Sequence, residues 1–209
     1  MRHVSSRALV RGALAGLWLG ALALGLLAVM RVDSTAGAAG PVPASWPEAA
    51  PLHLASDRAT IVAALHPHCP CSAASLETLA AIVTRAPGPS PRVYLLFFAD
   101  PAKPDDWVDA ALWRRAADLP FVRVRDAGGQ LGVRFGALTS GAVVVYDPDG
   151  RRGYAGGLTP ARGTGVAPDR IAALAARVFA PPAIAGAASA SQPGTGAVYG
   201  CPLQNPVAE

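Results

Sequence analysis

The stretch TIVAALHPHCPCSAASLETLAAIVTRA, residues 60–86, decides the fold because two kinds of apolar pattern meet in it at a pair of cysteines. The continuous apolar run over 59–65 is typical of a strand buried on both faces of a sheet. Beyond it, apolar residues recur at the spacing of an amphipathic helix: Ala73, Leu76, Leu79, Ala80 and Val83. The sequence therefore predicts a strand that leads directly into a helix, with two histidines and two cysteines at the junction.

The rest of the chain extends this order into an α/β domain. The expected elements are, in chain order, a buried strand at 92–99, a helix at 105–119, a strand at 121–126, a short helical or irregular piece at 128–137, a hairpin at 141–156 and a helix at 169–179. Parallel strands joined by crossover helices, followed by a hairpin and a closing helix, predict a mixed sheet flanked by helices on both faces.

Near the N-terminus, residues 12–30 form a run of 19 residues without a charge, which is long enough to span a bilayer as a helix. An uncleaved anchor and a cleaved signal peptide are the two alternatives. The apolar core of a signal peptide is shorter, about 7 to 15 residues, and Arg31 and Asp33 follow this run directly. The small residues of STAGAAG, at 34–40, suit cleavage. We expect a transmembrane anchor.

The charges indicate how this anchor is oriented. Arg2, Arg7 and Arg11 should keep residues 1–11 in the cytoplasm, by the positive-inside rule. The remainder would then lie outside the cytoplasm, in a compartment that tolerates disulfides. The formal net charge is +4, but four of the 18 basic residues lie at or before Arg31, so the other 14 balance the 14 acidic residues. This neutrality excludes nucleic-acid binding.

Composition divides the remaining chain into three parts. Residues 31–51 are rich in Pro, Ala and Gly and predict a linker. The folded domain is expected over 52–180. Residues 181–209 are again rich in Pro, Ala, Gly and Ser, and they predict a flexible tail that carries the third cysteine, Cys201.

At the junction, Cys69 is expected at the N-cap of the helix, Pro70 at its first position and Cys71 one residue further. Free backbone N–H groups and the helix dipole lower the pKa of a thiol at that place, which makes Cys69 the better nucleophile. Residues two apart in a helix point about 200° apart, so a Cys69–Cys71 disulfide needs a non-helical cap conformation. Such a disulfide would be strained and easily reduced.

Two other interpretations of the junction stay open. Imidazole and thiolate form a soft ligand set that suits copper(I) or zinc, and His68, Cys69, Cys71 and Cys201 would be its ligands. Alternatively, the two histidines are exposed loop residues and the cysteines pack at the helix start, which would leave a redox-inactive interaction domain.

Three separated segments, HPHCPCS at 66–72, FGALTSG at 135–141 and GCP at 200–202, follow in an order that resembles the thioredoxin-like superfamily. Within it, the chain resembles the RedB-like bacterial membrane-anchored proteins, over about 52–179 plus Cys201. The resemblance implies a thioredoxin-like fold, a bacterial inner-membrane location with a periplasmic domain, and thiol–disulfide oxidoreductase activity without a cofactor. Copper is the cofactor of the alternative interpretation.

The chain departs from the superfamily pattern at two places. One residue separates Cys69 from Cys71, where the usual dithiol has two. The usual cis-proline that faces the dithiol is replaced by Gly141, after Thr139 and Ser140. Since that proline shapes the peptide-binding edge and keeps metals off the thiols, its absence favours the metal alternative. A glycine there also permits an unusual backbone conformation.

The expected mechanism is attack by Cys69 and resolution by Cys71. The supporting residues are expected to be His66, His68, Pro70, Thr139, Ser140 and Gly141. Cys201 is expected to return to Cys69 as a third exchange thiol or a third ligand. The partners would be a protein or small-molecule thiol or disulfide and a membrane electron donor.

Overall fold

The computed structural model describes residues 6–180 and 196–203 and divides the chain into two units, Met1–Thr35 and Ala36–Glu209. The first five residues of the expected cytoplasmic segment lie outside the described residues. So do residues 181–195 and 204–209 of the expected tail.

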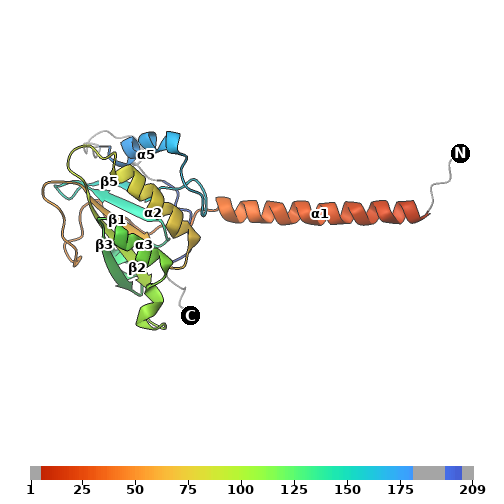
Figure 1. Ribbon diagram of the computed structural model, residues 1–209, viewed down its shortest axis with the longest axis horizontal. Coiled ribbons are helices and arrows are strands. Elements are labelled where there is room, and N and C mark those ends of the chain that lie inside the picture. Colours follow the sequence, from red (N-terminus) through yellow and green to blue (C-terminus); the bar gives the residue numbers. More distant parts are fainter. Residues whose placement is uncertain (1–5, 181–195, 204–209) are drawn as a thin grey trace. The chain divides into compact units, whose positions relative to one another are not determined.

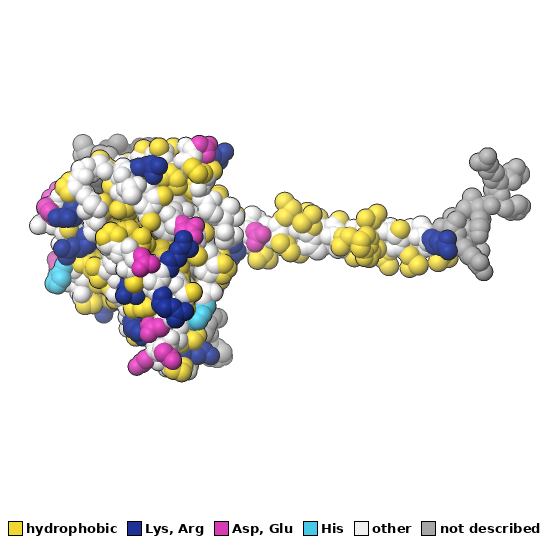
Figure 2. Space-filling model, viewed as in Figure 1, with side chains coloured by type: hydrophobic (Ala, Val, Ile, Leu, Met, Phe, Trp, Pro, Cys, Tyr) yellow, Lys and Arg dark blue, Asp and Glu magenta, His cyan; other side chains and the backbone are white. Residues whose placement is uncertain are grey.

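The first unit contains one long helix, α1, over Ser6–Ser34. Its part Val10–Ser34 is long and apolar enough to cross a membrane. Its large apolar side chains from Val10 to Val32 are exposed, and Figure 2 shows hydrophobic side chains along this helix. The predicted apolar helix is therefore confirmed as a candidate membrane span, and it extends beyond the expected 12–30.

The second unit is built on a five-stranded mixed sheet (Figure 1). The strands are β1 (Thr60–Leu65), β2 (Arg92–Ala99), β3 (Val122–Ala127), β4 (Ala142–Tyr146) and β5 (Arg152–Gly157). Their order is β3-β2-β1-β4-β5, in which β1 pairs in parallel with β2 and β2 with β3, whereas β4 is antiparallel to β1 and to β5. The predicted mixed sheet is confirmed, with β1 at its centre.

Helices cover one face of this sheet. They are α2 (Pro70–Val83), α3 (Ala111–Arg115) and α5 (Ile171–Val178). Leu79 of α2 and Ile171 of α5 join inward-facing strand residues such as Leu95 in one buried cluster. Because side chains alternate between the faces of a strand, every second residue of β1, β2 and β4 belongs to this cluster.

The opposite face is covered by the short helix α4 (Gln130–Arg134) and by residues 42–54, which pack on Val62 and Tyr146. The ring of Trp46 lies edge-on to Phe135 and Tyr146, with centroid distances of 5.2 and 5.3 Å. This differs from the linker expected over 31–51. This segment is rich in Pro and Ala, but its apolar side chains pack on the second face of the sheet.

The helix expected over 105–119 is broken into three pieces. A 3-10 turn over Asp105–Val108 precedes α3, and a second one over Ala116–Asp118 follows it. Ala110 has an extended backbone, with ψ of 174°, and interrupts the helix. The single-helix prediction was wrong because contacts with β3 hold residues 105–109 apart from α3.

The closing helix also begins as a 3-10 turn, over Pro168–Arg170, and continues as α5.

Candidate active site: three thiols at the start of α2

The first two thiols lie where β1 passes into α2. Cys69 is the N-cap residue, with an extended backbone at φ −96° and ψ 125°, and Pro70 begins the helix. The Cys69 N–H donates to the His66 carbonyl over 3.2 Å, and the His66 N–H donates to Ser72 Oγ over 2.9 Å. These bonds close a tight turn, and the predicted placement of Cys69 and Pro70 is confirmed.

The third thiol arrives from the C-terminal segment, which we define as residues 196–203. It runs antiparallel to residues 138–140, with a bridge between Thr139 and Pro202. The Ser140 N–H donates to the Cys201 carbonyl over 2.9 Å, and the Leu203 N–H donates to the Leu138 carbonyl over 3.0 Å. This pairing brings Cys201 Sγ to 3.1 Å from Cys69 Sγ, although 132 positions separate them in the sequence.

Together the three cysteines form a compact cluster, whose sulfur atoms all lie within 4.8 Å of one another. Cys69 and Cys71 are each 5% exposed, and Cys201 is half-buried. Ser140 connects the two parts of the cluster. Its hydroxyl accepts a hydrogen bond from the Cys201 N–H at 2.9 Å and donates to Cys69 Sγ at 3.7 Å.

The surroundings give the three thiols different acidities. Burial acts to raise the pKa of Cys69, but hydrogen bonds from Cys201, from Ser140 and from the Ser72 N–H outweigh it and lower the pKa to about 7. Burial raises the pKa of Cys71, and the hydrogen bond to Cys69 adds to this effect. The same two causes raise the pKa of Cys201 to about 12. Cys69 is therefore the first of the three thiols to ionise as the pH rises, and the other two thiols donate hydrogen bonds to it.

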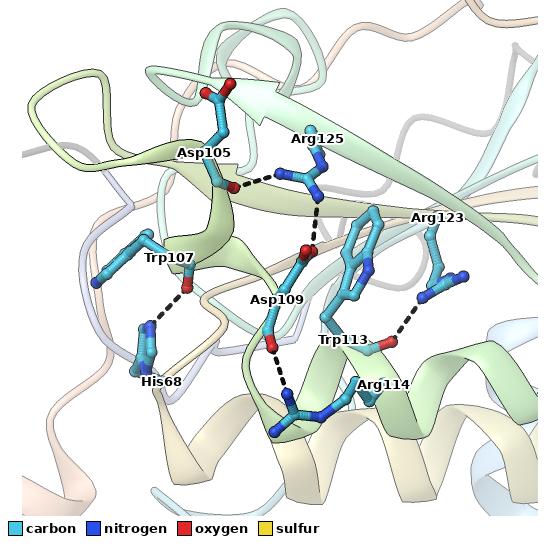
Figure 3. A network of polar contacts seen from close by, with 8 residues as sticks. All are labelled: His68, Asp105, Trp107, Asp109, Trp113, Arg114, Arg123 and Arg125. Carbon is cyan, nitrogen blue, oxygen red and sulfur yellow. Dashed lines mark hydrogen bonds and ion pairs between the residues drawn. The ribbon is translucent and has the colours of Figure 1, made fainter.

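Both histidines contact an aromatic group beside the thiols. The His66 ring is stacked on Phe98 at 5.9 Å and lies edge-on to Trp107 at 5.5 Å. Burial lowers the pKa of His66, and the neighbouring His68 lowers it further. His68 Nε2 donates to the Trp107 carbonyl over 2.9 Å (Figure 3), since a carbonyl can only accept. The cluster of potential metal ligands among the described residues contains the three cysteines and not His68.

Gly141 adopts the unusual backbone that its residue type permits. Its φ is +87°, and its N–H donates to the Ala64 carbonyl over 2.7 Å. A β-carbon at this position would lie 2.6 Å from the buried hydroxyl of Ser75. Thr139 serves another part of the fold, since its hydroxyl donates to the Ala38 carbonyl over 2.7 Å.

Two residues near the site escaped the sequence analysis. Trp107 is half-buried and contacts both histidines. The guanidinium of Arg162 donates to the Gly200 carbonyl and so holds the residue before Cys201. Nothing in the glycine-rich sequence around Arg162 distinguishes it from a solvated arginine.

The loop that carries Trp107 is fixed by a polar network (Figure 3). Arg125 of β3 donates to the Asp105 carbonyl and forms an ion pair with Asp109 at 2.6 Å. Arg114 donates to the Asp109 carbonyl over 3.0 Å. This network connects residues 105–109 to β3 and to α3.

A shallow depression of about 400 Å³ lies next to Cys69, and it is lined in part by His68, Pro70, Ala110 and Arg115. It offers room for the group that carries a reacting sulfur.

Comparison with known proteins gives the fold. No protein-family model matches the chain, and no curated protein matches it. A hypothetical protein of Sinorhizobium meliloti has a similar structure, with a TM-score of 0.53 and 20% identity over 81% of this chain and 94% of that one. An uncharacterized conserved protein of Geobacillus kaustophilus gives a TM-score of 0.51 and 18% identity over 84% and 95% of the two chains.

A secreted Mycobacterium tuberculosis disulfide oxidoreductase, homologous to E. coli DsbE, gives a TM-score of 0.41 and 18% identity over 59% of this chain and 83% of that one. The predicted thioredoxin-like fold is confirmed by the mixed sheet flanked by helices with a cysteine pair at the start of α2. The narrower resemblance to RedB-like proteins stays a prediction.

Proposed function

We propose that this protein is a thiol–disulfide oxidoreductase in which Cys69 is the attacking thiolate. The observation that carries the proposal is the position of Cys69 at the N-cap of α2, where its pKa is lowered to about 7 and two further thiols lie within 4.8 Å. A thiolate is the nucleophile in thiol–disulfide exchange, and a second thiol must be close enough to release the partner. The thioredoxin-like fold and its cysteine pair fit this redox role.

The reaction has two steps. The Cys69 thiolate attacks one sulfur of a partner disulfide, whose S–S bond breaks as a mixed disulfide forms. A second thiol of the protein then attacks Cys69 Sγ, and the partner leaves with its second sulfur reduced. The partner disulfide gains two electrons, and the protein dithiol is oxidised to a disulfide. The same steps in reverse transfer a disulfide to a partner dithiol.

The site residues have distinct parts in this chemistry. Ser140 and the helix N-terminus stabilise the thiolate, and Pro70 holds the first turn of α2. His68 lines the depression beside Cys69, and its ring contacts Trp107, which also contacts His66. The partner would be a protein or small-molecule thiol or disulfide, and a membrane component would exchange electrons with the domain.

The domain is proposed to face the periplasm from a bacterial inner membrane, anchored by α1 with residues 1–11 in the cytoplasm. The length and apolar composition of α1 and the arginines before it support this topology. Protease added to spheroplasts should remove the domain, and alkaline carbonate should leave the intact chain in the membrane. Protection of the domain would contradict the orientation, and release of a shortened soluble form would indicate signal-peptide cleavage.

Copper(I) delivery is a second candidate, favoured by the convergence of three thiols. A sulfur–metal distance of about 2.3 Å places the three sulfurs of a trigonal site about 4 Å apart. The cluster needs only small movements to reach this geometry, since its sulfurs already lie within 4.8 Å of one another. Copper would then be cargo, and His68 lies outside the group of potential ligand atoms that are within 4.8 Å of one another.

One preparation tests both candidates. The full chain, purified in detergent without oxygen, is analysed for bound copper and zinc and is then equilibrated with mixtures of reduced and oxidised glutathione. Exchange predicts a reversible loss of two free thiols, which Cys69→Ser abolishes. Stoichiometric copper bound through all three cysteines, with no reversible disulfide, would replace exchange by the copper function.

A further inference from the structure

The C-terminal segment occupies the site as an extended peptide would. It pairs with residues 138–140 through backbone bonds at the Cys201 carbonyl and the Leu203 N–H, and it presents the Cys201 thiol to Cys69. Addition of a strand to an exposed edge is a general way to bind a peptide. Here the peptide belongs to the chain itself.

Apolar anchors fix this segment on either side of the cysteine. Val198 is 8% exposed and Leu203 is 3% exposed, and both pack in a cluster with Phe98 and Ala142. The Gly37 N–H donates to the Val198 carbonyl over 2.8 Å, which adds a backbone bond. Two buried apolar side chains hold the backbone between them in place, so the position of Cys201 is specified rather than incidental.

The residue before Cys201 is constrained as well. A β-carbon at Gly200 would overlap the carbonyl group of Ser140, so only glycine allows the two backbones to approach this closely. Arg162 donates to the carbonyl of the same glycine. These contacts therefore hold the C-terminal segment close to the Cys69 thiolate.

The Cys201 thiol lies close enough to Cys69 Sγ to resolve a mixed disulfide. Its sulfur lies 3.1 Å from Cys69 Sγ, so formation of a bond of about 2.05 Å requires an approach of about 1 Å. Cys71 lies inside the first turn of α2 and only two positions from Cys69. The extended backbone of Cys69 also permits a disulfide with Cys71, so the preference for Cys201 rests on its sulfur–sulfur distance of 3.1 Å and on the pairing of its segment beside Cys69.

We propose that residues 200–203 are an internal substrate strand and that Cys201, not Cys71, resolves the exchange by closing a Cys69–Cys201 disulfide. This inference rests on the proposed function. The strand leaves to admit a partner disulfide to Cys69, and it returns to displace the partner. Cys71 stays a thiol and donates a hydrogen bond to Cys69.

With oxidised glutathione as the partner, the reaction proceeds in two exchange steps. Attack by the Cys69 thiolate breaks the glutathione disulfide, forms a Cys69–glutathione disulfide and releases one glutathione. Cys201 then attacks Cys69 Sγ, the second glutathione leaves as a thiolate, and it takes up the proton that Cys201 gives up. Two glutathione thiols and one Cys69–Cys201 disulfide result.

Tryptic mapping separates the two possible disulfides. Cleavage at arginine leaves Cys69 and Cys71 together in peptide 59–85 and Cys201 in peptide 178–209. The full chain is oxidised with glutathione disulfide, its free thiols are alkylated, and it is digested without reduction. A cross-link between the two peptides is expected in the wild type and in Cys71→Ser and should be lost in Cys69→Ser. A disulfide confined to peptide 59–85 would overturn the inference.

A trapping experiment tests the order of events. Cys201→Ser should retain glutathione on Cys69, whereas its matched control, Cys71→Ser, should clear the adduct as the wild type does. Retention in Cys71→Ser alone, or equal clearance in both variants, would overturn the role of Cys201 and leave the proposed function standing. If no adduct and no disulfide form in any variant, while all keep the wild-type circular dichroism spectrum, the proposed function itself fails.

Discussion

The start of α2 and the C-terminal segment supply thiols to one site by different means. Cys69 and Cys71 are placed by local geometry, since a buried strand ends, a proline begins a helix, and the cap residue lies between them. Cys201 is placed by pairing with residues 138–140, which are distant in sequence, and by two apolar anchors. The start of α2 is part of the helix-covered sheet, whereas the C-terminal segment packs onto that structure.

Because of this difference, we expect the two regions to open at different free energies. α2 belongs to the main hydrophobic cluster and should open only when the whole domain unfolds. The C-terminal segment belongs to a smaller cluster with few apolar contacts, so it should open locally at a lower free energy. A site formed from both regions can release Cys201 while the rest of the domain stays folded. Exchange with an external partner requires such a release.

The largest expected effect follows from removal of a side chain under α2. Leu79 is 1% exposed within the main cluster, so Leu79→Ala should lower the free energy of unfolding by about 3 kcal/mol. Denaturant titration followed by circular dichroism measures the change. A loss of well under about 1 kcal/mol would show that α2 is not part of the cooperative core.

A smaller effect on global stability is expected for Leu203→Ala, although Leu203 is as well buried, at 3% exposed. The lost contacts weaken docking of the segment by about 3 kcal/mol, which raises its open population up to about a hundredfold. The alkylation rate of Cys69 should rise accordingly while the unfolding midpoint changes little. Leu79→Ala is the matched control, and equal loss of global stability in both variants would remove the distinction between the two regions.

The sequence predicted the parts of the molecule that local patterns determine. Continuous apolar runs identified β1 and β2, and Cys69 followed by a proline predicted the cap of α2. The prediction that Cys201 returns to Cys69 was based on the presence of a third cysteine in the predicted flexible tail. The residues that place it, such as Leu203, carry no local pattern that indicates long-range pairing.

Other features depended on tertiary contacts that a single sequence does not display. The helix expected over 105–119 is interrupted because Arg125, on a separate strand, binds Asp105 and Asp109. Residues 42–54 resemble a linker in composition, but Trp46 fills the second face of the sheet. In both cases the contact is made with a residue that is distant in the sequence. Periodicity and composition describe only neighbouring residues, so they could not predict it.

The smallest predicted effect concerns the Ser140 hydroxyl, which contacts both regions. Ser140 donates to Cys69 Sγ and accepts from the Cys201 N–H, so Ser140→Ala removes one of the hydrogen bonds that lower the pKa of Cys69. Because the thiolate is the reactive form, alkylation of reduced wild-type protein should rise with pH and reach half of its maximum at about 7.

In Ser140→Ala the midpoint of this profile should move to higher pH by up to about one pH unit, since a net hydrogen bond contributes about 1 kcal/mol. Stopped-flow reaction with iodoacetamide between pH 5 and pH 9, spaced in steps of about half a unit, resolves such a shift. Thr139→Val is the control, because the Thr139 hydroxyl bonds to the Ala38 carbonyl and not to a thiol. A midpoint that is unchanged in Ser140→Ala, or equally shifted in Thr139→Val, would show that the thiolate at the α2 cap is stabilised without the hydroxyl that joins it to the C-terminal segment.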